Sequence, residues 1–209
     1  MLRAGVDSMD REQILASAEA IERNADNLTG LTRSFADARA VQAGSLGLAG
    51  GTVDLGRLVA DVVHDLSIVT QPHRICLRVR GRVEVHGDPV RLRQVLTNLL
   101  SNTAEFSPAG APVELEVWAS RASAFLSLVD HGPGVPPERE HELFGKSCRL
   151  DSSARGTGLG LYISRAIARA HGGDLTHHRS PSGSARFLLE LPLTRTGPAQ
   201  GLTSEPIGA

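Results

Sequence analysis

The sequence has few cysteines, few aromatic residues, no excess of charge of one sign and no long apolar run. Its two cysteines, Cys76 and Cys148, form neither a CxxC motif nor a secreted-style framework, which favours a reducing cytoplasm. A net charge of −1 excludes a global field that would draw the chain to nucleic acid or an anionic membrane. The longest uncharged stretch, residues 40–53, is too short and glycine-rich to insert into a bilayer, and residues 1–10 lack a signal core.

The length of 209 residues, with 41% hydrophobic content, suits one globular domain of about 150 residues and a remainder. We expect this division along the chain: an N-terminal helical region at 1–42, a glycine-rich linker at 43–52, a domain at 53–193 and a flexible tail at 194–209.

A long helix is predicted from about Asp10 to Gln42, because apolar side chains recur every seven residues along it. A seam this narrow on so long a helix favours pairing with another chain, although packing on its own domain is the alternative. We therefore expect a homodimer formed through Ile14, Ile21, Leu28 and Phe35.

The pattern within the domain mixes strands and helices without regular βαβ alternation. It predicts an α/β sandwich, in which one mostly antiparallel sheet is covered by helices on one face. Alternating apolar residues predict strands at 75–79 and 83–85, joined as a hairpin at Gly81. Further strands are expected at 113–119, 124–130, 174–178 and 185–191, and helices at 55–68, 88–105 and 159–170. Residues 131–158 form a loop far longer than the usual connection.

Asn98 and Asn102 are the first candidate functional residues. Their spacing places two carboxamides on one face of the predicted helix 88–105. A carboxamide oxygen is a suitable ligand for a Mg²⁺ ion that keeps most of its water ligands and also binds phosphate oxygens. The alternative is an ordinary pair of helix asparagines bonded to the backbone.

Asp130 begins the second candidate motif, Asp-His-Gly-Pro-Gly, directly after an apolar strand. A carboxylate at a strand end can accept a hydrogen bond from an exocyclic amine, and glycines at 132 and 134 let the backbone pass close to a flat ring. The alternative is a strand-ending turn.

A third motif, GTGLG, lies where the long loop becomes a helix. Consecutive N–H groups and the start of a helix make a cradle for phosphate oxygens. The motif does not follow the first strand of a βαβ unit, and there is no GxxxxGK[ST], so Rossmann and P-loop sites are excluded.

Taken in order, these motifs resemble the ATP-binding domain of the GHKL family, within it that of bacterial sensor histidine kinases. LRQVLTNLLSN resembles their N box, VDHGPGVP the first glycine box, ELFGK a shortened phenylalanine box and GTGLGLYISRAIARAHGGDL the second glycine box. The likeness covers about Val53 to Leu193.

The resemblance implies a site for ATP and Mg²⁺. Asn102 would hold the metal ion with Asn98 beside it, and Asp130 would accept from the adenine amine. Lys146, Arg149 and Arg155 are alternative sources of positive charge for the phosphates. The other implied contacts are Phe106 against adenine, Gly132 and Gly134 shaping its pocket, Phe144 as the apolar latch of a lid, and Gly156, Thr157, Gly158, Leu159 and Gly160 at the phosphates.

Two departures from the family pattern stand out. Glu105 occupies a position where these kinases commonly carry a phosphate-contacting lysine, so either its side chain points away or nucleotide binding is weakened. The segment that corresponds to the lid is also short.

No histidine lies in the helix 10–42, and the first in the chain is His64, inside the domain. The helix resembles the second helix of a kinase dimerisation hairpin whose histidine-bearing first helix is absent, so autophosphorylation within this chain is not supported. We therefore expect the γ-phosphate to pass to a histidine supplied in trans or by an upstream segment, and then to a response regulator. The alternatives are a degenerate kinase that acts as a binding module or scaffold and, third, an anti-sigma serine kinase. The location expected is the cytoplasm, as a protein of its own or as the cytoplasmic part of a membrane sensor.

Overall fold

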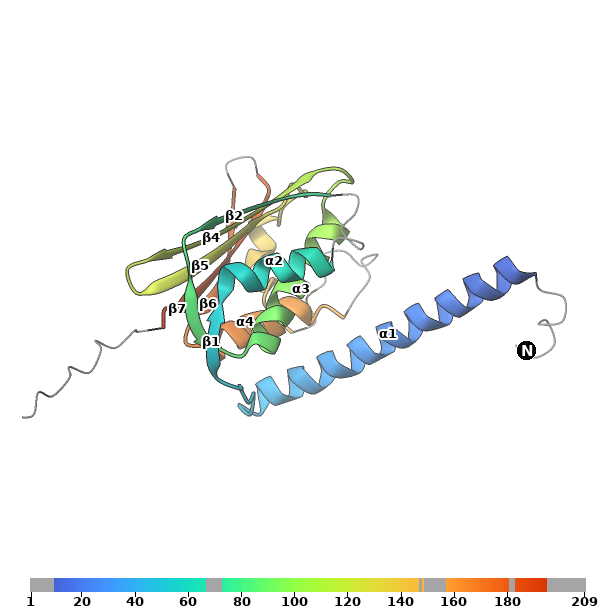
Figure 1. Ribbon diagram of the computed structural model, residues 1–209, viewed down its shortest axis with the longest axis horizontal. Coiled ribbons are helices and arrows are strands. Elements are labelled where there is room, and N and C mark those ends of the chain that lie inside the picture. The colour runs from blue at the N-terminus through green and yellow to red at the C-terminus, as the bar shows by residue number, and fades with distance from the viewer. Residues whose placement is uncertain (1–9, 67–72, 147, 149–156, 181–182, 195–209) are drawn as a thin grey trace, which may run out of the picture.

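The computed structural model describes residues 10–66, 73–146, 148, 157–180 and 183–194. A long helix, α1 (Arg11–Gln42), projects from a domain in which helices cover a β-sheet (Figure 1). None of the helices in these ranges is long and apolar enough to cross a membrane.

Helix α1 begins with a capping box, as its sequence allows. The Asp10 carboxylate accepts the Gln13 N–H at 2.8 Å, and the Gln13 side chain accepts the Asp10 N–H at 3.2 Å. Its 32 residues give the helix a length of about 48 Å. The predicted start and end of this helix are confirmed.

The domain is the predicted α/β sandwich. Its five-stranded sheet has the order β2-β4-β5-β7-β6, in which every neighbouring pair is antiparallel except β2 with β4. The strands are β2 (Arg74–Arg80), β4 (Pro112–Ser120), β5 (Ser123–Val129), β6 (Asp174–Arg179) and β7 (Ala185–Pro192). Helices α2 (Leu55–Asp65), α3 (Pro89–Phe106) and α4 (Gly160–Ala170) lie on one face of this sheet (Figure 1).

The predicted hairpin at Gly81 is wrong. Gly81 does turn the chain with a φ of +77°, but β3 (Glu84–Gly87) leaves the main sheet. It pairs antiparallel with β1 (Gly51–Asp54) in a second sheet, while β2 pairs in parallel with β4. Alternation of apolar residues predicts which face of a strand is buried, but it does not predict which strand pairs with it. Here both strands pair with strands that are distant in the sequence.

Helix α3 is positioned by its sequence at both ends. Asp88 caps it by accepting the N–H groups of Val90 and Arg91 at 2.9 and 3.2 Å, and Pro89 occupies the first turn. Along one side its buried residues, Leu92, Val95, Leu96, Leu99 and Leu100, recur with helical spacing and join the core. This stripe fixes the rotation of α3, and so the direction in which its asparagines face.

The described part of the loop 131–158 contains a 3₁₀ helix, η3 (Pro137–Glu142), which the sequence did not predict. Helix α2 ends at Asp65, before the predicted residue 68, which lies outside the described part of the chain.

Candidate nucleotide site

The two predicted asparagines of α3 have different surroundings. The Asn98 side-chain nitrogen donates to the Gly160 carbonyl at 3.3 Å and to the buried Ser164 hydroxyl at 3.2 Å, both on α4. The half-buried Asn102 side chain makes no hydrogen bond with the described residues. Asn98 therefore ties α3 to α4, while the Asn102 amide is available to a ligand.

Asp130 lies at the end of β5 and is only 6% exposed. Its Oδ1 accepts the Gly132 N–H at 3.0 Å and the Ala185 N–H at 3.3 Å. Its Oδ2 receives no hydrogen bond from the described residues. One oxygen is thus held by the backbone, and the other is an acceptor without a donor.

Burial raises the pKa of Asp130, an effect that the hydrogen bonds from Gly132 and Ala185 oppose. A buried carboxylate with one oxygen unpaired gains from any ligand that brings an N–H donor to it.

Gly132 and Gly134 pass where side chains do not fit. A Cβ added to Gly132 would lie 3.0 Å from the Phe106 carbonyl oxygen, so the chain after Asp130 runs against the end of α3. Gly134 has a φ of +71°, and a Cβ there would collide with the Gly183 carbonyl oxygen. Phe106, the last residue of α3, is 40% exposed.

The start of α4 forms the third part of the site. The Leu159 N–H donates to the Thr157 hydroxyl at 3.2 Å, and Gly158 has a φ of +67°. Among the described residues no side chain caps α4, and the first N–H groups of a helix have no acceptor within the helix itself. Gly160 faces Asn98, whose Cγ would lie 3.6 Å from an added Cβ.

Helix α3 thus forms the wall that the three predicted motifs share. Gly132 abuts its last turn and Gly160 contacts Asn98 one turn before Asn102. The structure brings together a carboxylate oxygen, a carboxamide and the first N–H groups of a helix, a set that suits an amine, a hydrated cation and phosphate oxygens respectively.

Phe144 and Lys146 were also predicted to contact nucleotide. Phe144 is half-buried and packs on α4, where the Arg165 guanidinium carbon lies 4.7 Å from the centre of its ring. Lys146 is exposed. The predicted Arg155 and Gly156, and the alternative cation Arg149, lie outside the described residues.

Sequence reasoning missed the residues that support this site. Arg165 donates from Nε and Nη2 to the Asp174 carboxylate at 2.8 and 2.9 Å, and these bonds hold the pKa of Asp174 well below its usual range. Ser164 and Gly183 were missed as well. The only signal in the sequence was their polar or small character, which does not identify a distant partner.

Comparison with known proteins gives the family of this chain. Residues 87–195 match the family of histidine kinase-, DNA gyrase B- and HSP90-like ATPases. The chain is 36% identical over 148 residues to the probable sensor histidine kinase TcrY of Mycobacterium tuberculosis, covering 68% of this chain and 31% of that protein. It is 31% identical to the circadian input-output histidine kinase CikA of Synechococcus elongatus, covering 83% of this chain and 24% of that protein.

Solved structures give the same result. The mycobacterial sensor histidine kinase MprB superposes with a TM-score of 0.63 at 26% identity, over 69% of this chain and 98% of that one. Full-length ShkA, solved with AMPPNP, superposes with a TM-score of 0.75 at 26% identity, over 89% of this chain and 40% of that one.

The fold and site define an ATP-binding domain of the sensor-kinase type. The chain belongs to the family of histidine kinase-, DNA gyrase B- and HSP90-like ATPases, and its domain is that of sensor histidine kinases. It spans less than a third of the length of TcrY or CikA.

Proposed function

We propose that this chain binds Mg·ATP between α3, the Asp130 turn and the start of α4, and transfers the γ-phosphate to a histidine outside residues 10–194. The observation that carries the proposal is the Asp130 carboxylate, which is buried, has Oδ1 fixed by two backbone N–H groups and has an Oδ2 that receives no hydrogen bond from the described residues. ATP as the donor puts the reaction in the cytoplasm.

Adenine fits the Asp130 end of the site. Its exocyclic amine supplies a donor for Asp130 Oδ2, which receives none from the described residues. Gly132 and Gly134 let the turn after Asp130 pack against the end of α3 and the backbone of Gly183, and so set the wall at this end of the site. We assign Phe106, which is 40% exposed at the end of α3, to pack on the ring.

The triphosphate fits the other end. The Asn102 carboxamide, which no described residue pairs, is available for Mg²⁺, and the first turn of α4, after Gly158, offers N–H groups to phosphate oxygens. When bound, Mg²⁺ neutralises phosphate charge. Asn98 acts by holding the start of α4 against α3, and Lys146 is the described cation that we assign to the phosphates.

We place the acceptor histidine elsewhere because none lies on α1, and the first histidine of the chain, His64, lies on α2 inside the ATP-binding domain. We assign it to another polypeptide or to an upstream segment, with a response regulator as the next acceptor. The test is to incubate the chain and radiolabelled Mg·ATP with candidate histidine-bearing helical hairpins. Acid-labile phosphate on a hairpin is expected, and a chain that binds nucleotide yet labels none of its cognate candidates contradicts transfer.

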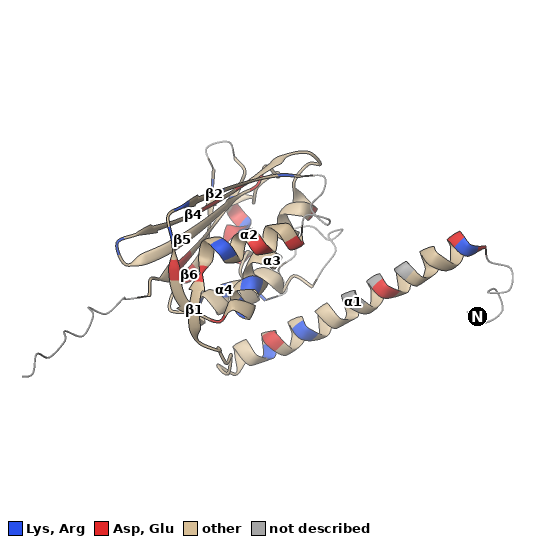
Figure 2. Cartoon of the chain, viewed as in Figure 1, with Lys and Arg blue, Asp and Glu red and all other residues tan. Residues whose placement is uncertain are grey.

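Dimerisation through α1 is part of the proposal. Its seam residues are largely exposed: Ile14 45%, Ile21 61%, Leu28 64% and Phe35 59%. Elsewhere α1 carries charges of both signs (Figure 2). A second copy would therefore bury the most apolar surface by packing along this seam.

We expect the wild-type chain to associate at tens of micromolar in sedimentation equilibrium. Ile21→Glu places a charge in the seam and should give a monomer. Ala16→Glu, about 140° around the helix from Ile21, is the matched control and should leave association unchanged. A monomeric wild type would refute the assignment of the seam.

A second candidate function is a binding module that holds nucleotide without transfer, and Glu105 favours it. This exposed carboxylate follows Asn102 by three residues, in the last turn of α3. Glu105→Lys should tighten Mg·ATP binding by about 3- to 10-fold, because it reverses a charge near the triphosphate. Calorimetry measures this, with Glu12→Lys on α1 as a control of equal charge change. Unchanged affinity in Glu105→Lys would show that Glu105 does not weaken the site.

A further inference from the structure

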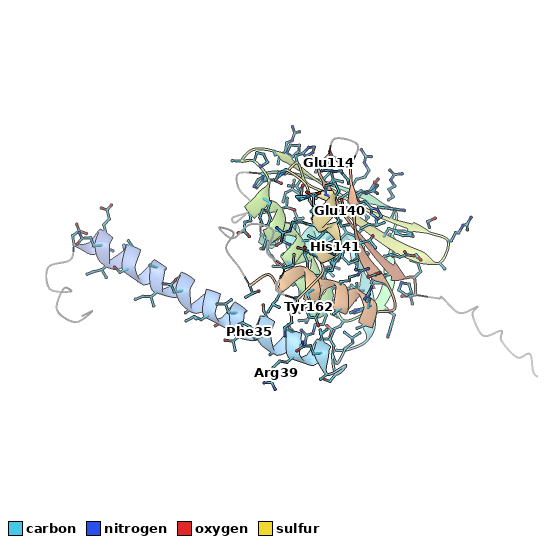
Figure 3. The ribbon with its side chains drawn as sticks, turned by 180° about the vertical axis from the view of Figure 1, so that it is seen from behind. Phe35, Arg39, Glu114, Glu140, His141 and Tyr162 are labelled. Atoms are coloured by element: carbon cyan, nitrogen blue, oxygen red, sulfur yellow. The ribbon has the colours of Figure 1, made fainter. Side chains whose placement is uncertain are left out.

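Helix α1 is attached to the domain at its C-terminal end. Among its described side chains, Asp37 and Ala38 are buried, at 5% and 3% exposure. In Figure 3, Tyr162 at the start of α4 lies beside the part of α1 that carries Phe35 and Arg39. The segment of α1 that meets the domain is therefore short and lies next to the proposed phosphate end of the site.

A buried carboxylate makes this attachment. Asp37 Oδ1 accepts from Arg91 Nη1 at 2.7 Å, and its Oδ2 accepts from Gln94 Nε2 at 2.7 Å. Arg91 Nη1 also donates to Gln94 Oε1 at 3.0 Å, which closes a ring of three side chains. A buried carboxylate is costly unless its hydrogen-bond partners are in place. This contact therefore favours the observed orientation of α1 relative to the domain over other orientations.

The linker that follows α1 returns to the same end of α3. The Ala49 N–H donates to Asp88 Oδ2 at 2.9 Å, on the residue that caps α3. In the linker between α1 and Ala49, Gly44 has a φ of +63°, and a Cβ added at Gly44 or Gly47 would meet no atom. Leu46 packs against the hydrophobic core of the domain. The glycine linker alone is a weak constraint on the direction of α1.

We propose that Asp37, Arg91 and Gln94 form an ionic joint that makes α1 and the domain one rigid body and points the nucleotide site toward the α1 helices. Arg91 and Asn102 are separated by 11 residues of one continuous helix, about 16 Å, so the joint and the Mg²⁺ ligand share a rigid rod. Asp37 is a positioning residue in this proposal, whose transfer part rests on the proposed function.

Rigidity is tested by distance measurement between spin labels in the full chain. One label is placed on the exposed Cys76 of β2 and one on Ala16→Cys, in a Cys148→Ser background diluted with unlabelled chain. The joint predicts a single narrow distance distribution that becomes at least twice as broad in Asp37→Ala and in Arg91→Ala.

The matched control is Asp65→Ala, which breaks an exposed pair with Arg93 on the same helix α3, at 2.8 Å, and should leave the distribution narrow. The charge exchange Asp37→Arg with Arg91→Asp should narrow it again. Equal widths in wild type and Asp37→Ala would overturn the joint, whether or not the chain transfers phosphate.

Positioning is tested by kinetics with a histidine-bearing hairpin that wild type labels. Asp37→Ala should lower kcat at least tenfold with KM for ATP and calorimetric affinity unchanged within twofold, and the charge exchange should restore kcat to within threefold. An unchanged kcat would overturn positioning. A wild type that binds nucleotide but labels no hairpin counts against the proposed function instead, and the label distances still decide on the joint.

Discussion

Asp130→Asn is expected to weaken nucleotide binding by about 10- to 100-fold, the loss that follows removal of a hydrogen bond to a charged group. Asparagine retains one oxygen for the N–H groups of Gly132 and Ala185, so the turn keeps its shape. Its amide nitrogen then replaces Oδ2 and presents a donor to the adenine amine, which is itself a donor.

The same substitution should leave folding stability equal or higher at neutral pH. Burial raises the pKa of Asp130 in the folded chain above its value of 3.8 in the unfolded one, so the folded state binds the proton more tightly. Stability contributed by this group is present below pH 3.8 and is lost as the pH rises through the raised pKa. Removing the charge removes that loss.

The pH dependence of binding has the opposite direction. Oδ2 accepts from adenine best when Asp130 is ionised, so affinity should fall as pH decreases through the raised pKa, at a higher pH than for an ordinary aspartate. Calorimetry from pH 8 to 5 measures this, and Asp130→Asn should lose this part of the pH dependence.

The matched control for Asp130→Asn is Asp54→Asn. Asp54 caps α2 by accepting the Arg57 N–H at 3.0 Å, and asparagine caps helices equally well. The control removes one charge and should keep both affinity and stability. Equal affinity in wild type and Asp130→Asn would refute the assignment of the adenine end.

Asn102→Ala should abolish the dependence of nucleotide affinity on Mg²⁺ and lower any phosphotransfer at least 100-fold, because loss of a metal ligand removes charge neutralisation at the phosphates. Stability should change by less than about 0.5 kcal/mol, since the half-buried side chain makes no hydrogen bond with the described residues.

Asn98→Ala provides the contrast on the same helix. It leaves the Ser164 hydroxyl, at 0% exposure, without the Asn98 donor and loosens the start of α4. A loss of about 1–3 kcal/mol of stability is expected, with Mg²⁺ dependence retained in the folded protein. Thermal unfolding and calorimetry with and without Mg²⁺ separate the two asparagines. If Asn102→Ala keeps its Mg²⁺ dependence, Asn102 is not the ligand.

Local signals in the sequence predicted most of the fold. Asp10 and Asp88 cap α1 and α3 through contacts within three residues of themselves, and the apolar stripe of α3 sets its buried side. Strand pairing could not be read in the same way. The valines at 83 and 85 alternate as they would in a hairpin, yet β3 pairs with β1, because the choice of neighbour depends on distant segments.

The site shows the same division between local and distant information. Asn102, Asp130 and Gly160 lie in motifs short enough to recognise, and the structure brings those motifs to one helix. Their supports could not be predicted, since Gly134 needs the backbone of Gly183 and Phe144 meets Arg165 only in the fold. The seam of α1 was read from its heptad spacing, whereas Asp37 looked like one more polar residue until its partners Arg91 and Gln94 were seen.

The central claim is that Mg·ATP binds between α3, the Asp130 turn and the start of α4, and titration calorimetry of the full chain with a non-hydrolysable ATP analogue tests it most directly. The account predicts micromolar binding that weakens when Mg²⁺ is chelated and that is lost or sharply reduced in Asn102→Ala and Asp130→Asn. No binding at millimolar analogue with Mg²⁺ present, in a folded wild-type chain, would contradict it.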